Sequence, residues 1–235
     1  GKPVLCEKPF SISKKESEIM IAASNNNNVA LLEGMWTRYL PHINEIQKII
    51  QIDTIGDIES LLAFHHQNLS EVNKPRLWTK ELGGGSLLDL GIYVVSFAHM
   101  ILGTPDEIDA NASFAKTGVD TKTSMIFKYS DSVIATLSCS MLDSMPNRAI
   151  ITGTKGYIEI DHSFYAPSSF RVITNDGKID EYPKIYEGHG LREQAIELER
   201  CVKNNSIESA ILPHEETLEV MKSMDKIKSI IGREF

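Results

Sequence analysis

The sequence predicts an α+β protein, because its secondary-structure pattern changes character along the chain. Two short apolar runs, at residues 3–6 and 29–32, flank a helical stretch and form a β-α-β pattern. Over residues 107–174, strand-like runs alternate with turn residues, which is typical of antiparallel strands. Two amphipathic helices close the chain. A parallel-type unit followed by antiparallel strands is the pattern of an α+β fold.

Capping and turn residues predict the limits of the first helix. Ser13 and Glu16 have the spacing of a capping box, so we expect a helix from Ser13 to about Ser24. The asparagine run at residues 25–28 predicts a turn, because Asn tolerates left-handed backbone conformations.

The remaining elements follow from hydrophobic periodicity. Helices are expected from Pro41 to near Gly56 and over residues 87–102, 191–203 and 215–231. A half-buried strand is expected over residues 58–66. Strands of an antiparallel meander are expected at residues 124–129, 133–140, 148–152, 157–160 and 171–174.

Composition limits the class of protein. The chain has 235 residues, 42% of them hydrophobic and 24% charged, which suits a globular protein with a sizeable core. A formal charge of -8 without a basic cluster argues against nucleic acid as a partner. No run approaches the roughly 18 consecutive apolar residues of a membrane helix, so we expect no membrane span. The start of the chain lacks a signal-peptide pattern, and its three cysteines are scattered, which favours a cytoplasmic setting without a structural metal site.

Three segments carry a resemblance to a known family. Residues 1–9 read GKPVLCEKP, residues 33–41 read EGMWTRYLP, and residues 83–93 read GGGSLLDLGIY. In this order they resemble the glucose-fructose oxidoreductase, inositol dehydrogenase and rhizopine-catabolism protein family, and most of all its dihydrodiol dehydrogenase-like branch. The first looks like the family's E-K-P signature, the second like its crossing between domains, and the third like its glycine-rich helix opening with a catalytic Tyr. The resemblance covers nearly the whole chain.

The resemblance implies two domains. Residues 1–34 are expected to be the C-terminal remnant of a Rossmann-type dinucleotide-binding domain. Residues 35–235 are expected to form a substrate-binding and dimerisation α+β domain with a large, mostly antiparallel open sheet. Family members carry a G-x-G-x-x-G turn upstream of the E-K-P, and the glycines at residues 83–85 lie outside the β-α-β unit and are not this turn. We therefore expect a chain truncated at its N-terminus, which leaves open whether it binds cofactor and is active alone.

The resemblance also implies a reaction: hydride transfer between NAD(P) and a secondary alcohol or carbonyl of a sugar, polyol or dihydrodiol. Reduction of a carbonyl needs a proton donor at the developing alkoxide, and Tyr93 is the expected donor. Lys8 is expected to lower the pKa of Tyr93. Asp89, one helical turn before Tyr93, is expected to orient a substrate hydroxyl or the lysine. The alternative for each of the three is an ordinary surface or core-edge residue.

Further site residues are expected around this trio. Cofactor contacts are expected from Glu7, Lys8, Pro9, Trp36 and Arg38, and substrate contacts from Arg76, Trp78 and His189. A Trp stacks on the apolar face of a sugar and an Arg reaches its hydroxyls. The alternatives are an interdomain packing role for Trp36, a surface position for Arg38 and an anchoring role for Arg76 and Trp78 in their loop, while a helix-opening turn explains His189 equally well.

The histidine pair His65 and His66 does not predict a metal site. Adjacent strand residues point to opposite faces and cannot chelate one ion, so strand packing or an interface is expected.

The expected partners are a small-molecule substrate and further copies of this chain. An exposed sheet face, such as that of residues 123–129, suits a homodimer or higher homo-oligomer, which the resemblance also implies. A rival interpretation is a non-catalytic ligand-sensing or assembly domain of the same fold. The presence of Lys8, Asp89 and Tyr93 together argues against a sensor, because a sensor needs no proton donor.

Overall fold

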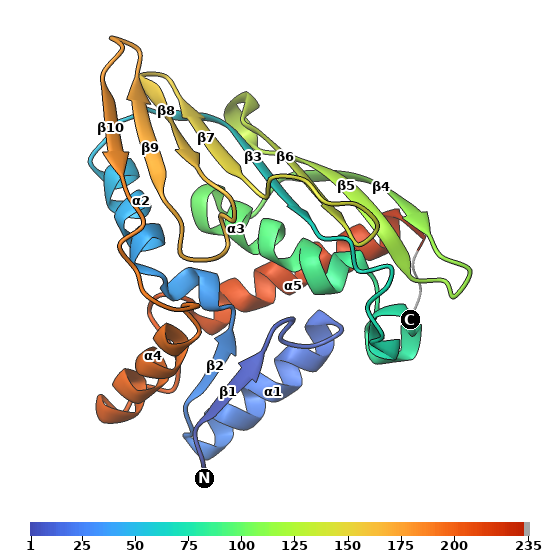
Figure 1. Ribbon diagram of the computed structural model, residues 1–235. Helices are drawn as coiled ribbons and strands as arrows, with labels where there is room; N and C mark the ends of the chain where they lie inside the picture. Colours follow the sequence, from blue (N-terminus) through green and yellow to red (C-terminus); the bar gives the residue numbers. More distant parts are fainter. Residues whose placement is uncertain (233–235) are drawn as a thin grey trace.

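The computed structural model describes residues 1–232, beginning with a β-α-β unit (Figure 1). Strand β1 (Val4–Glu7) is followed by helix α1 (Lys14–Asn27) and strand β2 (Leu31–Gly34). The two strands pair in parallel, from Val4 opposite Leu31 to Glu7 opposite Gly34. The predicted β-α-β unit is therefore confirmed.

Helix α1 starts as expected but ends later. The Ser13 side chain accepts a hydrogen bond from the Glu16 N–H at 3.3 Å, and the Glu16 carboxylate accepts one from the Ile12 N–H at 3.0 Å. The asparagines up to Asn27 continue the helix, and only Asn28, with φ 50°, has the left-handed conformation that ends it. The predicted turn at residues 25–28 is thus one residue long.

The rest of the chain is built on a sheet of eight strands. These are β3 (Ile58–His66), β4 (Glu107–Phe114), β5 (Asp120–Lys128), β6 (Ile134–Ser140), β7 (Ala149–Gly153), β8 (Gly156–Ile160), β9 (Phe170–Thr174) and β10 (Ile179–Tyr182). Their order is β10-β9-β8-β7-β3-β6-β5-β4, and every neighbouring pair is antiparallel except β3–β6. The mostly antiparallel open sheet is confirmed. The simple meander is wrong, because β3 lies between β6 and β7.

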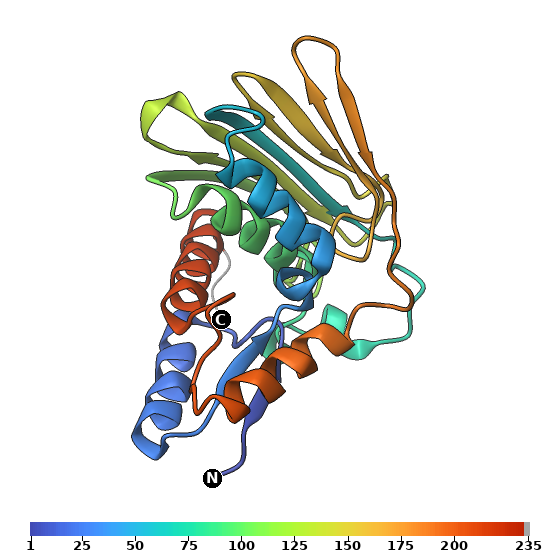
Figure 2. The same cartoon turned by 90° about the vertical axis from the view of Figure 1, so that its left-hand side faces the viewer.

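Helices cover one face of this sheet, and its other face lies at the surface (Figures 1 and 2). The covering helices are α2 (Pro41–Gln51), α3 (Ile92–Leu102) and α5 (His214–Ile230), with a π-helical turn, Leu87–Gly91, leading into α3. Alternate strand residues such as Leu61, Phe127 and Ile151 point to the helices and are fully buried. The core therefore lies between the sheet and these three helices.

One helical stretch is long and apolar enough to cross a membrane by length and composition alone. It runs from Lys80 to Leu102, and 78% of its most apolar window is buried inside the structure. Burial in the core between sheet and helices accounts for its composition.

The last two helices return to the N-terminal unit (Figure 2). Helix α4 (Arg192–Lys203) packs against β1 and β2, and α5 packs against α1. The N–H of Lys14 donates to the Asp225 carboxylate at 2.9 Å, and His214 Nε2 lies 2.8 Å from the Leu31 carbonyl oxygen. Segments from both ends of the chain thus form one packed region.

Candidate active site

Lys8, just after the carboxyl end of β1, joins two residues that lie far away in sequence. Its ammonium donates to the backbone oxygen of Asp89 at 2.7 Å and lies 3.7 Å from the Asp89 carboxylate. The same ammonium lies 4.7 Å from the centre of the Tyr93 ring, which is a cation–π distance. The structure therefore brings Lys8, Asp89 and Tyr93 together.

Close packing at the glycine-rich segment positions Asp89 and Tyr93. A Cβ on Gly84 would lie 2.5 Å from the Arg76 carbonyl oxygen, so only glycine allows the loop to pass this close to the helix opening. The buried Asp120 carboxylate accepts from the Leu87 N–H at 2.6 Å and from the Ser86 hydroxyl at 2.7 Å. These bonds fix the start of the helical segment that carries Asp89 and Tyr93.

The Tyr93 hydroxyl accepts a hydrogen bond from the Trp36 indole N–H at 2.9 Å. Burial raises the pKa of Tyr93, and the Trp36 hydrogen bond opposes this only in part. The expectation that Lys8 lowers this pKa is wrong for this conformation, because the ammonium lies over the ring and donates to Asp89 instead of the phenol oxygen. Burial lowers the pKa of Lys8 itself, and the Asp89 carboxylate opposes that shift.

Two aromatic residues that the sequence analysis did not assign to the site complete the cluster. The His65 ring stacks on Tyr165 with centres 4.0 Å apart, and both rings lie close to Tyr93, at 4.9 Å and 5.2 Å. Gln67 donates to the Tyr165 hydroxyl at 2.7 Å. Burial, followed by the charge of Lys8, lowers the pKa of His65 to about 3, so its imidazole is neutral.

The position of His65 in an alternating strand indicates, from the sequence alone, that its side chain points to the face opposite to that of His66. The alternation of β3 places His65 on the helix-covered face and His66 on the other, as the expected opposite orientation requires. The sequence predicts strand packing or an interface for both, and His65 lies instead in the cluster around Tyr93. Tyr165 lies in the loop before β9, where no periodicity or motif marks it.

Arg76 also reaches the cluster. Its guanidinium donates to the Asp89 carboxylate at 2.7 Å, and 47% of its side chain is exposed. Asp89 is therefore held between two cations, Lys8 and Arg76. Trp78, in the same short helical turn (Pro75–Trp78), is half-buried against the core.

Arg38 does not reach the cluster. Only 2% of its surface is exposed, its Nε donates to the Ser96 hydroxyl at 3.0 Å, and its guanidinium pairs with Glu216. Arg38 thus ties the turn Trp36–Tyr39 to α3 and α5, and it lies neither at the surface nor beside Tyr93.

The other expected contact residues lie at different depths. Glu7 and Pro9 flank Lys8 at the end of β1, exposed and half-buried respectively. His189 is exposed in the loop before α4, and none of the described hydrogen bonds or ring contacts links it to the cluster. Roles for these residues stay predictions.

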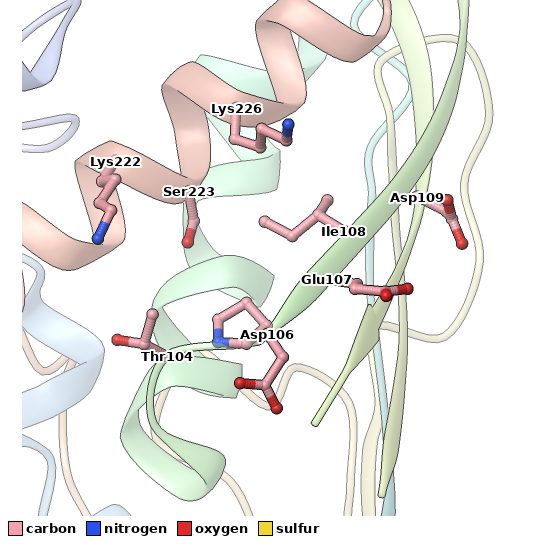
Figure 3. Close-up of a pocket in the computed structure, with 9 residues that line it drawn as sticks. Thr104, Asp106, Glu107, Ile108, Asp109, Lys222, Ser223 and Lys226 are labelled. Carbon is pink, nitrogen blue, oxygen red and sulfur yellow. The ribbon is translucent and has the colours of Figure 1, made fainter. Parts of the chain in front are cut away.

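A groove on another part of the surface has several reactive side chains that are already paired with neighbouring groups. It has a volume of about 510 Å³ and runs between α5 and the start of β4 (Figure 3). Two of its carboxylates, Glu107 and Asp109, pair with Lys128 of the sheet, and its Ser223 hydroxyl contacts His99. Among residues 1–232, no group of three or more His, Cys, Asp or Glu side chains is arranged to hold a metal ion. The Lys8 cluster is therefore the candidate active site.

Comparison with known proteins places the chain in a family. Residues 43–159 match the GFO/IDH/MocA C-terminal domain. The trans-1,2-dihydrobenzene-1,2-diol dehydrogenase of Xenopus tropicalis is 33% identical over 99% of this chain and 72% of its own length. The mouse enzyme of the same name is 31% identical over 100% of this chain and 72% of its own.

Solved structures share the fold. The aldose-aldose oxidoreductase of Caulobacter crescentus superposes with a TM-score of 0.86 at 22% identity, over 97% of this chain and 69% of its own. The 3-ketoreductase KijD10 of Actinomadura kijaniata, solved with NADP and TDP-benzene, gives a TM-score of 0.85 at 20% identity, over 98% of this chain and 71% of its own.

The fold and the relatives together define an oxidoreductase that transfers hydride. The chain belongs to the GFO/IDH/MocA family.

Proposed function

We propose that this protein transfers a hydride between NAD(P) and a secondary alcohol or carbonyl of a sugar, polyol or dihydrodiol. The observation that carries the proposal is the convergence of Lys8, Asp89 and Tyr93 after the carboxyl end of β1, which is where ligands bind in parallel α/β sheets. The similar dehydrogenases act on dihydrodiols by name, and KijD10 was solved with NADP. Nothing in the comparisons favours the alternative of a non-catalytic sensor or assembly domain.

Each residue of the trio has a distinct role in the proposal. Tyr93 donates its phenol proton to the developing alkoxide, or accepts it in the reverse direction. The raised pKa keeps Tyr93 protonated at neutral pH, as a proton donor must be. Lys8 places its positive charge against the Tyr93 ring, and Asp89 holds the ammonium in place.

The nicotinamide end of a dinucleotide fits the residues after β1 and β2. When bound, the nicotinamide supplies or accepts the hydride. The Lys8 ammonium lies here, and the buried Gln194 carbonyl oxygen, which has no hydrogen-bond partner among the described residues, lies 3.3 Å from a Cβ built on Gly34. We assign residues 1–34 to the dinucleotide-binding domain and residues 35–235 to the substrate domain, with α4 and α5 packed back on the first.

The first test concerns cofactor binding. NADPH and NADH are titrated by fluorescence into this chain and into a chain extended upstream through the expected glycine-rich turn. These 235 residues contain no G-x-G-x-x-G sequence, so we expect tight binding by the longer chain only. Equally tight binding by the shorter chain would show that the pyrophosphate site has been misplaced.

The second test concerns Tyr93. In the chain that binds cofactor, Tyr93→Phe is expected to lower kcat about 10²–10⁴-fold with polyol and dihydrodiol substrates, because the proton donor is lost. KM and the NADPH dissociation constant are expected to stay within a few-fold.

The matched control is Tyr129→Phe, which removes a buried hydroxyl that has no hydrogen-bond partner among the described residues and lies outside the cluster. This control is expected to keep wild-type kcat. A Tyr93→Phe enzyme that keeps more than a third of the wild-type kcat rules out the proposed role.

The proposed assembly is a homodimer in the cytoplasm, formed through the open face of the sheet. An apolar band crosses this face and consists of Leu62, Ile126, Ile134, Ile150, Tyr157 and Ile179. Ile126, Ile134, Tyr157 and Ile179 are 39–55% exposed. Contiguous apolar patches on a monomer are usually small, so a second copy is the proposed cover for this band.

A further inference from the structure

Trp36 contacts the oxygen atom of Tyr93 directly. The indole N–H of Trp36 donates to the Tyr93 hydroxyl at 2.9 Å. An indole N–H is a donor only, so the phenol oxygen is the acceptor of this bond. The phenol hydrogen therefore points in another direction, and none of the hydrogen bonds described for residues 1–232 uses it. This hydrogen is available to a substrate oxygen.

The ammonium of Lys8 does not take this position at the phenol oxygen. It donates to the backbone oxygen of Asp89 at 2.7 Å and lies 4.7 Å from the centre of the Tyr93 ring. A cation over the face of a ring is attracted by the π-electrons of the ring and makes no hydrogen bond to the oxygen. Of Lys8 and Trp36, only Trp36 directs a donor hydrogen at the atom that loses the proton.

Neighbouring groups fix the position of the Trp36 indole. Trp36 opens the short helical turn Trp36–Tyr39, and the Thr37 hydroxyl of this turn donates to the Tyr165 backbone oxygen at 2.7 Å. The Trp36 and Tyr165 rings meet edge-on, with centres 6.3 Å apart. The buried Arg38 ties the same turn to α3 and α5. The donor is therefore preorganised, and preorganisation makes a hydrogen bond effective at a developing charge.

We propose that Trp36 is a catalytic residue that stabilises the phenolate of Tyr93 by donating its indole N–H to the phenol oxygen. This inference rests on the proposed function, in which Tyr93 is the proton donor. In carbonyl reduction the substrate carbon gains a hydride from the reduced nicotinamide and the substrate oxygen takes the phenol proton. The electron pair of the broken O–H bond stays on the phenol oxygen. In alcohol oxidation the phenolate takes the proton back, so in both directions the negative charge lies 2.9 Å from the indole nitrogen.

The surroundings of Tyr93 otherwise disfavour its phenolate. Burial is the main cause that raises the pKa of Tyr93, and the charges of Asp89, Glu7 and Tyr165 raise it further. Of these influences, only the Trp36 hydrogen bond lowers the pKa. A phenolate at this position therefore depends on the indole donor.

The cations and the histidine near Tyr93 do not replace this donor. Lys8 and Arg76 both donate to Asp89, at 2.7 Å each. The His65 ring centre is 4.9 Å from that of Tyr93, but burial is the main cause that lowers the pKa of His65 to about 3, so this ring carries no charge at neutral pH. The hydrogen bond from Trp36 is thus the contact to test.

The first test measures the pKa of Tyr93 in this chain, without cofactor or substrate. A fluorinated tyrosine, whose phenol is more acidic than that of tyrosine, replaces the tyrosines, and the fluorine NMR signal missing from Tyr93→Phe belongs to position 93. Trp36→Phe is expected to raise the pKa at this position by about 1–2 units, because a hydrogen bond to the charged form is lost. Circular dichroism at each pH checks that the chain stays folded.

A second substitution removes only the N–H and keeps the shape of the ring. The chain has two tryptophans, and Trp78→Phe leaves Trp36 as the remaining one. In this background Trp36 is replaced by benzothienylalanine, in which sulfur takes the place of the indole N–H, or by 7-azatryptophan, which keeps the N–H. We expect the first analogue to raise the pKa of Tyr93 by about 1–2 units and the second not to raise it. Trp78→Phe alone is the matched control and is expected to leave this pKa unchanged, because none of the hydrogen bonds described for residues 1–232 joins Trp78 to Tyr93.

The second test uses the chain that binds cofactor. The acidic limb of the kcat profile for alcohol oxidation reports the ionisation of the base, and Trp36→Phe is expected to move it to higher pH by about 1–2 units. A Tyr93 pKa that the benzothienylalanine analogue leaves unchanged overturns this inference and leaves the proposed function standing. A raised pKa with an unmoved pH profile would show that Tyr93 is not the proton donor, which overturns the proposed role of Tyr93 and this inference with it.

Discussion

Glu33 is a carboxyl group placed where a charge is costly. Only 4% of its surface is exposed, and its carboxylate accepts a hydrogen bond from the Thr217 hydroxyl at 2.9 Å. Burial raises the pKa of Glu33 from 4.5 to about 7, although the Thr217 hydrogen bond and the charge of Arg38 oppose this shift and Glu216 adds to it. The protonated form is therefore favoured in the folded protein over a pH range in which the unfolded chain is ionised.

This shift predicts a pH-dependent stability. Because the pKa of Glu33 is higher in the folded state, the folded protein binds more protons than the unfolded chain between about pH 4.5 and 7. The stabilisation of the folded state by this proton binding is therefore complete below this pH range and is lost as the pH rises through it. Glu33→Gln removes the ionisation and keeps an acceptor for Thr217. We expect the variant to gain about 2–4 kcal/mol in the free energy of unfolding, relative to wild type, between pH 5 and pH 8.

Urea unfolding at several pH values measures this difference. Glu59→Gln, which changes an exposed glutamate of β3, serves as the control and is expected to give a difference independent of pH. A Glu33→Gln difference that stays constant from pH 5 to pH 8 would show that Glu33 is ionised in the folded protein throughout.

For single residues, a sequence motif predicts the position of the backbone but not the direction of the side chain. Lys8, Asp89 and Tyr93 were found from ordered motifs, because each motif fixes a backbone position at the site. Arg38 belongs to such a motif too, but its side chain turns into the core toward Glu216. Side-chain direction depends on tertiary neighbours, which residue spacing does not contain.

At the scale of elements, periodicity predicted the helices and the internal strands well. The edge strands β4 and β10 were not predicted, because edge strands have polar residues on their exposed side and little apolar alternation. The insertion of β3 between β6 and β7 was not predicted either. Its parallel pairing with β6 joins residues about 70 positions apart, and no local pattern records such a contact.

At the scale of the whole molecule, the apolar band on the open sheet face predicts the oligomeric state. Tyr157→Lys and Ile179→Lys place charges on exposed positions of the band, where the monomer fold tolerates them and a dimer interface does not. Light scattering is expected to show a dimer for the wild type and a monomer for both variants. Ile185→Lys is the control, because Ile185 is 90% exposed but lies in the loop after β10, outside the sheet.

The light-scattering result decides whether the apolar band joins two copies of the chain. A wild-type monomer at micromolar concentration, or a dimer that both lysine variants preserve, would show that the open face does not join two copies.

The packing of α4 and α5 against β1, α1 and β2 also has a consequence for biosynthesis. Residues 4–34 leave the ribosome before the helices that cover them, which are made roughly 200 residues later, a delay of about 10–40 s at ordinary translation rates. During that time the buried side of β2 and the Glu33 carboxyl remain in water. The N-terminal unit therefore acquires its stable packing only when the last helix emerges, so folding of this region is a late event that follows synthesis of the sheet.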